Sequence, residues 1–234
     1  MEHAVFLNLP HQNNSPLKII SWNINSARTK LENINVYRFL SNFDIISLNE
    51  TKTPLTVSMP GFISYRSKSV TGAASHRGGV VVMVKNYLAP QVFNIDTSII
   101  DQVWLQVRCA PDIMFGFCYI PPADSPYFSH QSFVAMNEKM LDFKSDLKFC
   151  IIGDLNARFG ASVRDIPLRS KMLDINNCTY PNIPDNVPSP NDNAYILSTL
   201  CVDNDLVVLN NIKLPLVTFL AKRLSRRETN GYQR

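Results

Sequence analysis

A strand, a helix and a second strand follow one another within residues 18–50, and this order restricts the possible folds more than any other feature. KIISWNI (18–24) and FDIISLNE (43–50) are apolar runs of strand length that end in polar residues. Residues 25–42 have apolar side chains at helical spacing, namely Ala27, Leu31, Ile34 and Tyr37. A unit of this length joins parallel strands through a right-handed crossover, so the sequence predicts an α/β fold.

The middle of the chain alternates strand-like runs with Gly, Pro, Asn and Asp turns, which is typical of an antiparallel meander. These runs are FISYRS, GVVVMVKNYL, VFNI, DQVWLQVRC and IMFGFCYI. A helix over 129–147 then leads to the strand that ends in GDLN, and a further helix over 193–202 precedes a strand over 205–210. We therefore expect a four-layer sandwich, in which two packed mixed β-sheets are flanked by helices.

Polar residues follow the apolar runs at four places, and ligands in α/β folds gather beyond the carboxyl ends of strands. The four places are Trp22-Asn23, Asn49-Glu50-Thr51, Tyr119 before Ile120-Pro121-Pro122, and Asp154-Leu155-Asn156. Each one taken alone is explained by a turn, a cap or a half-buried aromatic ring. Because side chains alternate along a strand, Asp154 and Asn156 are expected to point the same way.

Taken together, these residues predict a metal site for phosphate chemistry. A Glu and an Asp beside amide side chains, without a Cys/His cluster, form a hard oxygen set that suits Mg²⁺ or Mn²⁺ better than zinc. The net charge of +4 permits a polyanionic partner without requiring one. No apolar run reaches the roughly 18 residues of a membrane span, and cysteines in apolar runs favour reduced thiols and an intracellular location, nuclear or cytoplasmic.

Five short motifs in a fixed order carry a resemblance to a known family. They are W-N at 22–23, L-N-E-T at 48–51, R-G-G-V at 77–80, Y-I-P-P at 119–122 and G-D-L-N-A at 153–157. This set resembles the endonuclease/exonuclease/phosphatase family, and in particular the apurinic-endonuclease-like domain of non-LTR retrotransposons. The resemblance covers residues 18–219, which leaves 1–17 as an expected flexible leader and 220–234 as a basic tail.

The resemblance implies a role for each matching residue. Glu50 is expected to hold the Mg²⁺ or Mn²⁺ ion, and Asn23 to orient Glu50 or the phosphate beside it. Asp154 is expected to activate the attacking water, and Asn156 to position Asp154 and the phosphate. Tyr119 is expected to contact a phosphate oxygen, and this set serves hydrolysis of a phosphodiester in DNA.

The end of the sequence departs from the family pattern. Thr218 stands where the family has a threonine at the edge of the substrate site. An Asp in an I-D-Y strand and a terminal S-D-H are absent from the sequence. These absences predict that the closing C-terminal strands are missing and that activity is impaired.

Two further functions are compatible with the residues. A non-catalytic nucleic-acid-binding remnant would use the basic tail and the rim of the site. A phosphatase or lipid phosphodiesterase would share the metal chemistry and differ in its loops. The sequence has no anchoring segment that favours the second of these.

Overall fold

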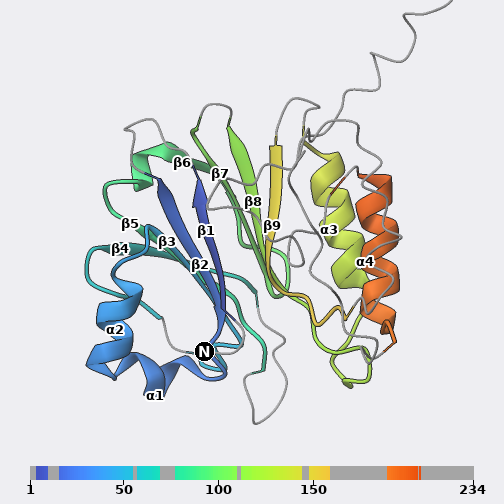
Figure 1. The fold of residues 1–234 in the computed structure, drawn as a ribbon, viewed down its shortest axis with the longest axis horizontal. Helices are drawn as coiled ribbons and strands as arrows, with labels where there is room; N and C mark the ends of the chain where they lie inside the picture. The colour runs from blue at the N-terminus through green and yellow to red at the C-terminus, as the bar shows by residue number, and fades with distance from the viewer. Residues whose placement is uncertain are drawn as a thin grey trace, which may run out of the picture.

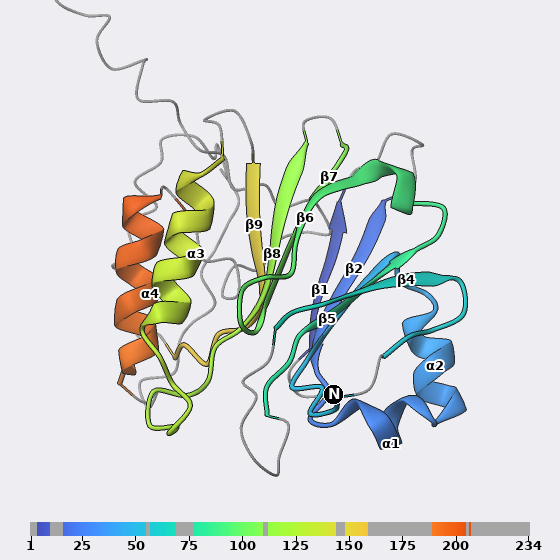
Figure 2. The same cartoon turned by 180° about the vertical axis from the view of Figure 1, so that it is seen from behind.

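The computed structural model describes residues 4–9, 16–54, 57–68, 77–109, 112–143, 148–158, 189–204 and 206, with residues 4–9 described as backbone. Two mixed β-sheets lie at the centre, with helices outside each of them (Figures 1 and 2). This arrangement confirms the predicted α/β sandwich. The prediction that the closing C-terminal strands are missing concerns residues outside the described ones. Thr218, the basic tail and all but residue 206 of the strand expected over 205–210 lie there too.

The first sheet is built around the parallel pair that the sequence predicts. Its order is β1 (Ala4–Leu9), β2 (Leu17–Asn23), β3 (Ile45–Asn49), β5 (Val81–Lys85) and β4 (Phe62–Arg66). β2 and β3 run parallel, and their register pairs Asn23 with Asn49. Residues 1–17 were expected to form a flexible leader, but Ala4–Leu9 is a strand that pairs antiparallel with β2 along its outer edge.

The second sheet holds the rest of the meander. Its order is β6 (Val92–Asp96), β7 (Gln102–Val107), β8 (Ile113–Tyr119) and β9 (Lys148–Asp154). β8 and β9 are parallel, and Tyr119 pairs with Asp154 at their carboxyl ends. The expected single meander is therefore divided between two sheets: the chain leaves the first sheet after β5 and enters the second at β6, through the short 3₁₀ helix Ala89–Gln91.

The described residues form four α-helices, which cover the outer faces of the sheets. α1 (Ala27–Leu31) and α2 (Ile34–Leu40) flank the first sheet, while α3 (Gln131–Leu141) and α4 (Asp192–Asp203) flank the second (Figure 1). The single helix predicted over 25–42 is wrong, because Asn33 caps a new helix by accepting a hydrogen bond from the backbone N of Asn35. This break turns Ile34 away from the core, and its side chain is 56% exposed.

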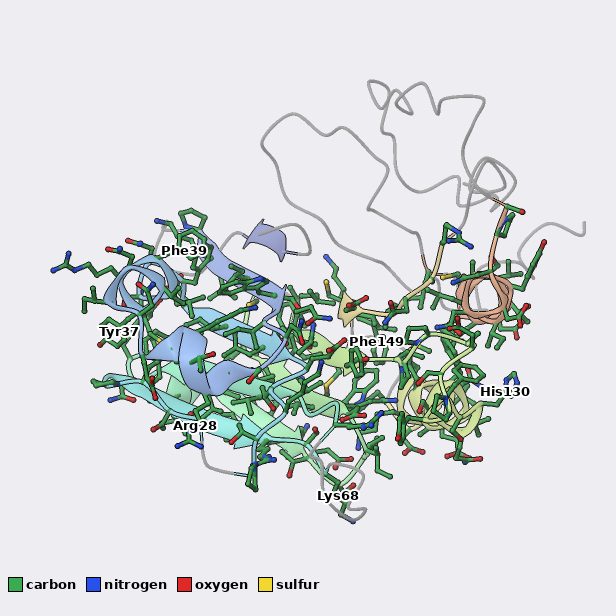
Figure 3. The ribbon with its side chains drawn as sticks, turned by 90° about the horizontal axis from the view of Figure 1, so that it is seen from below. Arg28, Tyr37, Phe39, Lys68, His130 and Phe149 are labelled. Atoms are coloured by element: carbon green, nitrogen blue, oxygen red, sulfur yellow. The ribbon has the colours of Figure 1, made fainter. Side chains whose placement is uncertain are left out.

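Apolar side chains fill the spaces between these layers. Figure 3 looks along the molecule from below, with Tyr37 and Phe39 marking α2 on one side and His130 marking the start of α3 on the other. One cluster between the sheets joins Ile19 and Val82 of the first sheet to Leu105 and Phe115 of the second. Because β2 also lies against β9, the carboxyl ends of strands from both sheets meet at one end of the sandwich.

No helix among the described residues is long and apolar enough to cross a membrane. The four described cysteines, Cys109, Cys118, Cys150 and Cys201, are free thiols, and burial raises the pKa of each of them above its ordinary value.

Gly153 is the second-last residue of β9. It allows β9 to approach β8 more closely than any residue with a side chain would. A Cβ atom at this position would lie 1.8 Å from the carbonyl oxygen of Cys118, which is backbone and cannot move aside. The glycine of the G-D-L-N-A motif is therefore required by the pairing that brings Asp154 beside Tyr119.

We expect Gly153→Ala to lower the free energy of unfolding by about 3 kcal/mol, because the added methyl group must push two paired strands apart. Gly61→Ala is the matched control, since Gly61 also has a positive φ, of 84°, but nothing lies within 4 Å of its Cβ position. That control is expected to cost about 1–2 kcal/mol, from backbone strain alone. Urea unfolding followed by circular dichroism measures both, and equal losses would contradict the steric argument.

Candidate active site

Asn23 joins two carboxylates that come from different sheets. Its side-chain Nδ2 donates to Glu50 Oε1 at 2.9 Å and to Asp154 Oδ2 at 2.8 Å. Glu50 follows β3 in the first sheet, whereas Asp154 ends β9 in the second. One amide group therefore holds together two acidic groups that would repel each other without an intervening donor.

The backbone around Glu50 is held in an uncommon conformation. Glu50 and Lys52 have φ angles of 52° and 48°, in the left-handed region that non-glycine residues seldom adopt. The turn after β2 supports this segment, because Ser26 N donates to Glu50 O at 2.8 Å and Ala27 N donates to Thr51 O at 3.0 Å. This twist directs the Glu50 side chain toward Asn23 and Asp154.

Lys52 supplies a positive charge that the sequence reading did not identify. Its Nζ lies 2.7 Å from Glu50 Oε2 and donates to Asn25 Oδ1 at 2.6 Å. Burial raises the pKa of Glu50, but hydrogen bonds from Lys52, Asn23 and Tyr119 and the Lys52 charge more than offset it, so the pKa lies below its ordinary value of 4.5. The Glu-Thr-Lys order, with a lysine two residues after the acid, was the available signal.

Tyr119 adds a hydroxyl donor to the same group. Its phenol hydrogen-bonds to Glu50, and its pKa is raised by burial first, and then by the Glu50 charge and hydrogen bond and by the charges of Asp154 and Asp101. A phenol with a raised pKa stays protonated at neutral pH. Tyr119 is therefore a hydrogen-bond donor at this site.

Asn156 lies next to Asp154, but not in the way that strand alternation suggested. β9 ends at Asp154, and Asn156 has a φ of 46°, so the expectation that the two side chains point the same way does not apply. Its backbone N donates to Asp154 Oδ1 at 3.2 Å, and its side-chain Nδ2 donates to the carbonyl of Ile120 at 2.8 Å. Asn156 thus contacts Asp154 through its backbone and the Ile120 loop through its side chain.

Two asparagines at the start of α4 complete this framework, and the sequence reading did not assign them to the site. The Asn193 side chain, fully buried, donates to the carbonyls of Pro121 and Leu155, both at 3.0 Å. Asn191 donates to the carbonyl of Asn156 at 2.7 Å. Amides spaced two residues apart at a helix start were the only sequence signal, and that pattern more often indicates capping.

Comparison with known proteins identifies the family. Residues 20–218 match the model of the endonuclease/exonuclease/phosphatase family, which is most of the chain. The chain belongs to this family. It is also 28% identical over 148 residues to a probable RNA-directed DNA polymerase from transposon X-element of Drosophila melanogaster. That match covers 61% of this chain and 15% of the relative, so the chain corresponds to a small part of that protein's length.

Solved structures that resemble this chain have lower sequence identities to it. An endonuclease/exonuclease/phosphatase family protein from Leptotrichia buccalis is 13% identical, with a TM-score of 0.44 over 59% of this chain and 67% of that one. An AP endonuclease from Archaeoglobus fulgidus is 16% identical, with a TM-score of 0.38 over 61% and 58% of the two chains. Beta toxin from Staphylococcus aureus is 14% identical, with a TM-score of 0.40 over 62% and 67%.

The donors of this family member suit a hard divalent cation with few protein ligands. Among the described residues, no group of three or more His, Cys, Asp and Glu side chains is placed to hold a metal. Mg²⁺ nevertheless binds at many sites through one or two carboxylates, with water and phosphate oxygens as its other ligands. The Glu50 carboxylate, 17% exposed and held from both sides, fits that requirement.

We expect Lys52→Met to raise the pKa of Glu50, because the variant removes a donor and a charge that favour the ionised acid. In the wild type the lowered pKa means that ionised Glu50 stabilises the fold above pH 4.5, and this contribution is lost as the pH falls through the lower folded value. The ¹³C carboxyl shift of labelled Glu50, titrated with pH, measures the change. Lys18→Met, at the opposite end of β2, is the control, and a Glu50 pKa that rises equally in both variants would contradict the assignment.

Proposed function

We propose that this family member is a metal-dependent phosphodiester hydrolase that nicks DNA, as the endonuclease of a non-LTR retrotransposon. The observation that supports the proposal most is the Asn23 amide, which holds Glu50 and Asp154 side by side. One carboxylate can then bind a cation while the other serves a water molecule. Such a pairing meets the two main needs of phosphodiester hydrolysis, which are charge neutralisation and an oriented nucleophile.

Each residue has a distinct task in this proposal. Asp154 accepts a proton from the attacking water as the new P–O bond forms and the bond to the leaving oxygen breaks. Asn23 and the backbone N of Asn156 fix the two oxygens of that carboxylate. The protonated phenol of Tyr119 exchanges its hydrogen bond to Glu50 for one to a phosphate oxygen when substrate is present. Glu50 would hold Mg²⁺ or Mn²⁺. The bound ion supplies positive charge to the phosphate oxygens.

Features beside the site favour a nucleic-acid substrate. Arg77 precedes the Gly78–Gly79 turn, whose Gly78 carbonyl accepts from Lys52 N, so Arg77 lies close to Lys52. The Arg77 guanidinium lies 4.4 Å from the ring centre of Tyr127, which is 41% exposed. A cation stacked on an exposed aromatic ring suits phosphates and bases. The resemblance to a transposon-encoded polymerase agrees with this substrate class.

A supercoiled-plasmid assay with Mg²⁺ tests the hydrolase. We expect Asp154→Ala to reduce the nicking rate by about 10²- to 10⁴-fold, because the proton acceptor is lost. Asp203→Ala, which removes an exposed carboxylate at the end of α4, is the control and should leave the rate unchanged. Equal nicking by wild type and Asp154→Ala would assign the activity to another site, and the wild-type rate also tests the predicted impairment.

Nucleic-acid binding without catalysis is the second candidate, and the Arg77–Tyr127 pair is the observation that favours it. Anisotropy of labelled duplex DNA across a salt series should show affinity that falls as salt rises. Arg77→Ala should reduce that slope by about one unit, while Arg38→Ala, an exposed charge on α2, should not. A slope near zero in the wild type would exclude this mode of binding.

A further inference from the structure

Asp101 is a buried acid near the site that the proposed chemistry does not use. It precedes β7 in the second sheet and is 5% exposed, with a φ of 54°. Burying a carboxylate is unfavourable unless its hydrogen bonds compensate. Asp101 therefore needs an explanation in terms of what it contacts.

The Asp101 carboxylate holds the Gly78–Gly79 turn, which enters β5 of the first sheet. Oδ1 accepts from Gly79 N at 2.6 Å. A Cβ atom on Gly78 would lie 2.6 Å from Asp101 Oδ2, so the carboxylate packs directly against the Gly78 backbone. Both glycines have positive φ angles, of 66° and 87°, so this tight turn is specific to glycine in conformation and in space.

The opposite side of this turn holds the segment that carries Glu50. Gly79 O accepts from Thr51 N at 3.2 Å, and Gly78 O accepts from Lys52 N at 3.1 Å. A Cβ atom on Gly79 would lie 2.7 Å from Thr51 Oγ1, so these residues are also in close contact. The turn is thus enclosed between the Asp101 carboxylate and the residues that follow Glu50.

Asp101 also reaches Tyr119 through its backbone, because its carbonyl accepts from Tyr119 N at 2.9 Å. Asp101 therefore contacts both the Gly78–Gly79 turn and Tyr119, and each of these in turn contacts the segment that carries Glu50. The left-handed backbone at Glu50 and Lys52 is costly, and such strain persists only where neighbouring contacts enforce it.

We propose that Asp101 is a positioning residue: its carboxylate fixes the Gly78–Gly79 turn, and the turn holds the Glu50–Lys52 backbone so that the Glu50 side chain faces the site. We call this role of the Asp101 carboxylate the brace. It is argued from the contacts alone, whereas its consequence for catalysis rests on the proposed function. The pKa of Asp101 reflects the same contacts. Burial raises the pKa of Asp101 to about 6, opposed by the Gly79 hydrogen bond and increased by the Glu50 charge.

Amide hydrogen exchange of the full chain tests the brace without relying on activity. We expect Asp101→Ala to speed exchange at Thr51 and Lys52 by about tenfold, because the carbonyls that accept their hydrogen bonds lose support. Asp101→Asn keeps an acceptor for Gly79 N, so the amides of Thr51 and Lys52 should exchange at the wild-type rate in this variant. Asp44→Ala is the matched control: Asp44 is 8% exposed and accepts from Lys18 N at 2.8 Å, at the other end of β3.

The outcomes separate the brace from general destabilisation. Faster exchange at Thr51 and Lys52 in Asp101→Ala, but not in Asp44→Ala, supports the proposal. Exchange unchanged in Asp101→Ala, or equally faster in both variants, overturns it. Should Asp101→Ala be recovered unfolded, Asp101→Ser provides the same comparison, since its hydroxyl is too short to reach Gly79 N.

Nicking assays then address the catalytic consequence. With a nicking wild type, Asp101→Ala should raise the Mg²⁺ concentration needed for half-maximal rate by about tenfold, and Asp101→Asn should restore it, as expected when a ligand is misplaced. An unchanged Mg²⁺ requirement overturns that consequence. A wild type that does not nick defeats the proposed hydrolase, while the exchange data still decide the brace.

Discussion

The site depends on holding two like charges together at the junction of two sheets. Glu50 and Asp154 are both acceptors, so their proximity requires donors, and Asn23 provides one N–H for each. Lys52 and Tyr119 add a cation and a hydroxyl on the Glu50 side. The packing of the two sheets therefore determines the geometry of the site. The ends of β2 and β9 must lie side by side for the Asn23 amide to reach both carboxylates.

Local patterns were sufficient to predict the layers and most of the elements. The apolar runs ending at Asn23 and Asn49 gave the parallel pair, and the helix predicted over 193–202 is α4. The sequence patterns did not predict two elements correctly. Asn33 divides the helix that periodicity predicts as continuous over 25–42. The strand Ala4–Leu9 forms because the edge of β2 is open to pairing, and this edge exists only in the assembled sheet.

The candidate residues were found through strand ends and motif order, but their supports were not. Lys52 has its role because the backbone turns left-handed at Glu50, and no composition rule predicts that turn. Asn193 and Asp101 act through carbonyls and amides of residues far away in the sequence, such as Pro121 and Gly79. Periodicity describes one element at a time, so contacts of this kind are not visible to it.

The separation of Asn23 from Asp154 along the chain has a consequence for synthesis and folding. The hydrogen bond between them spans 131 positions, and the other contacts of Asp101 and Asn193 also join distant segments. Such contacts form late, because packing must first offset the entropic cost of closing the long loops between the contacting residues. A nascent or partly collapsed chain thus lacks the paired carboxylates, and the candidate site forms only when both sheets are in place.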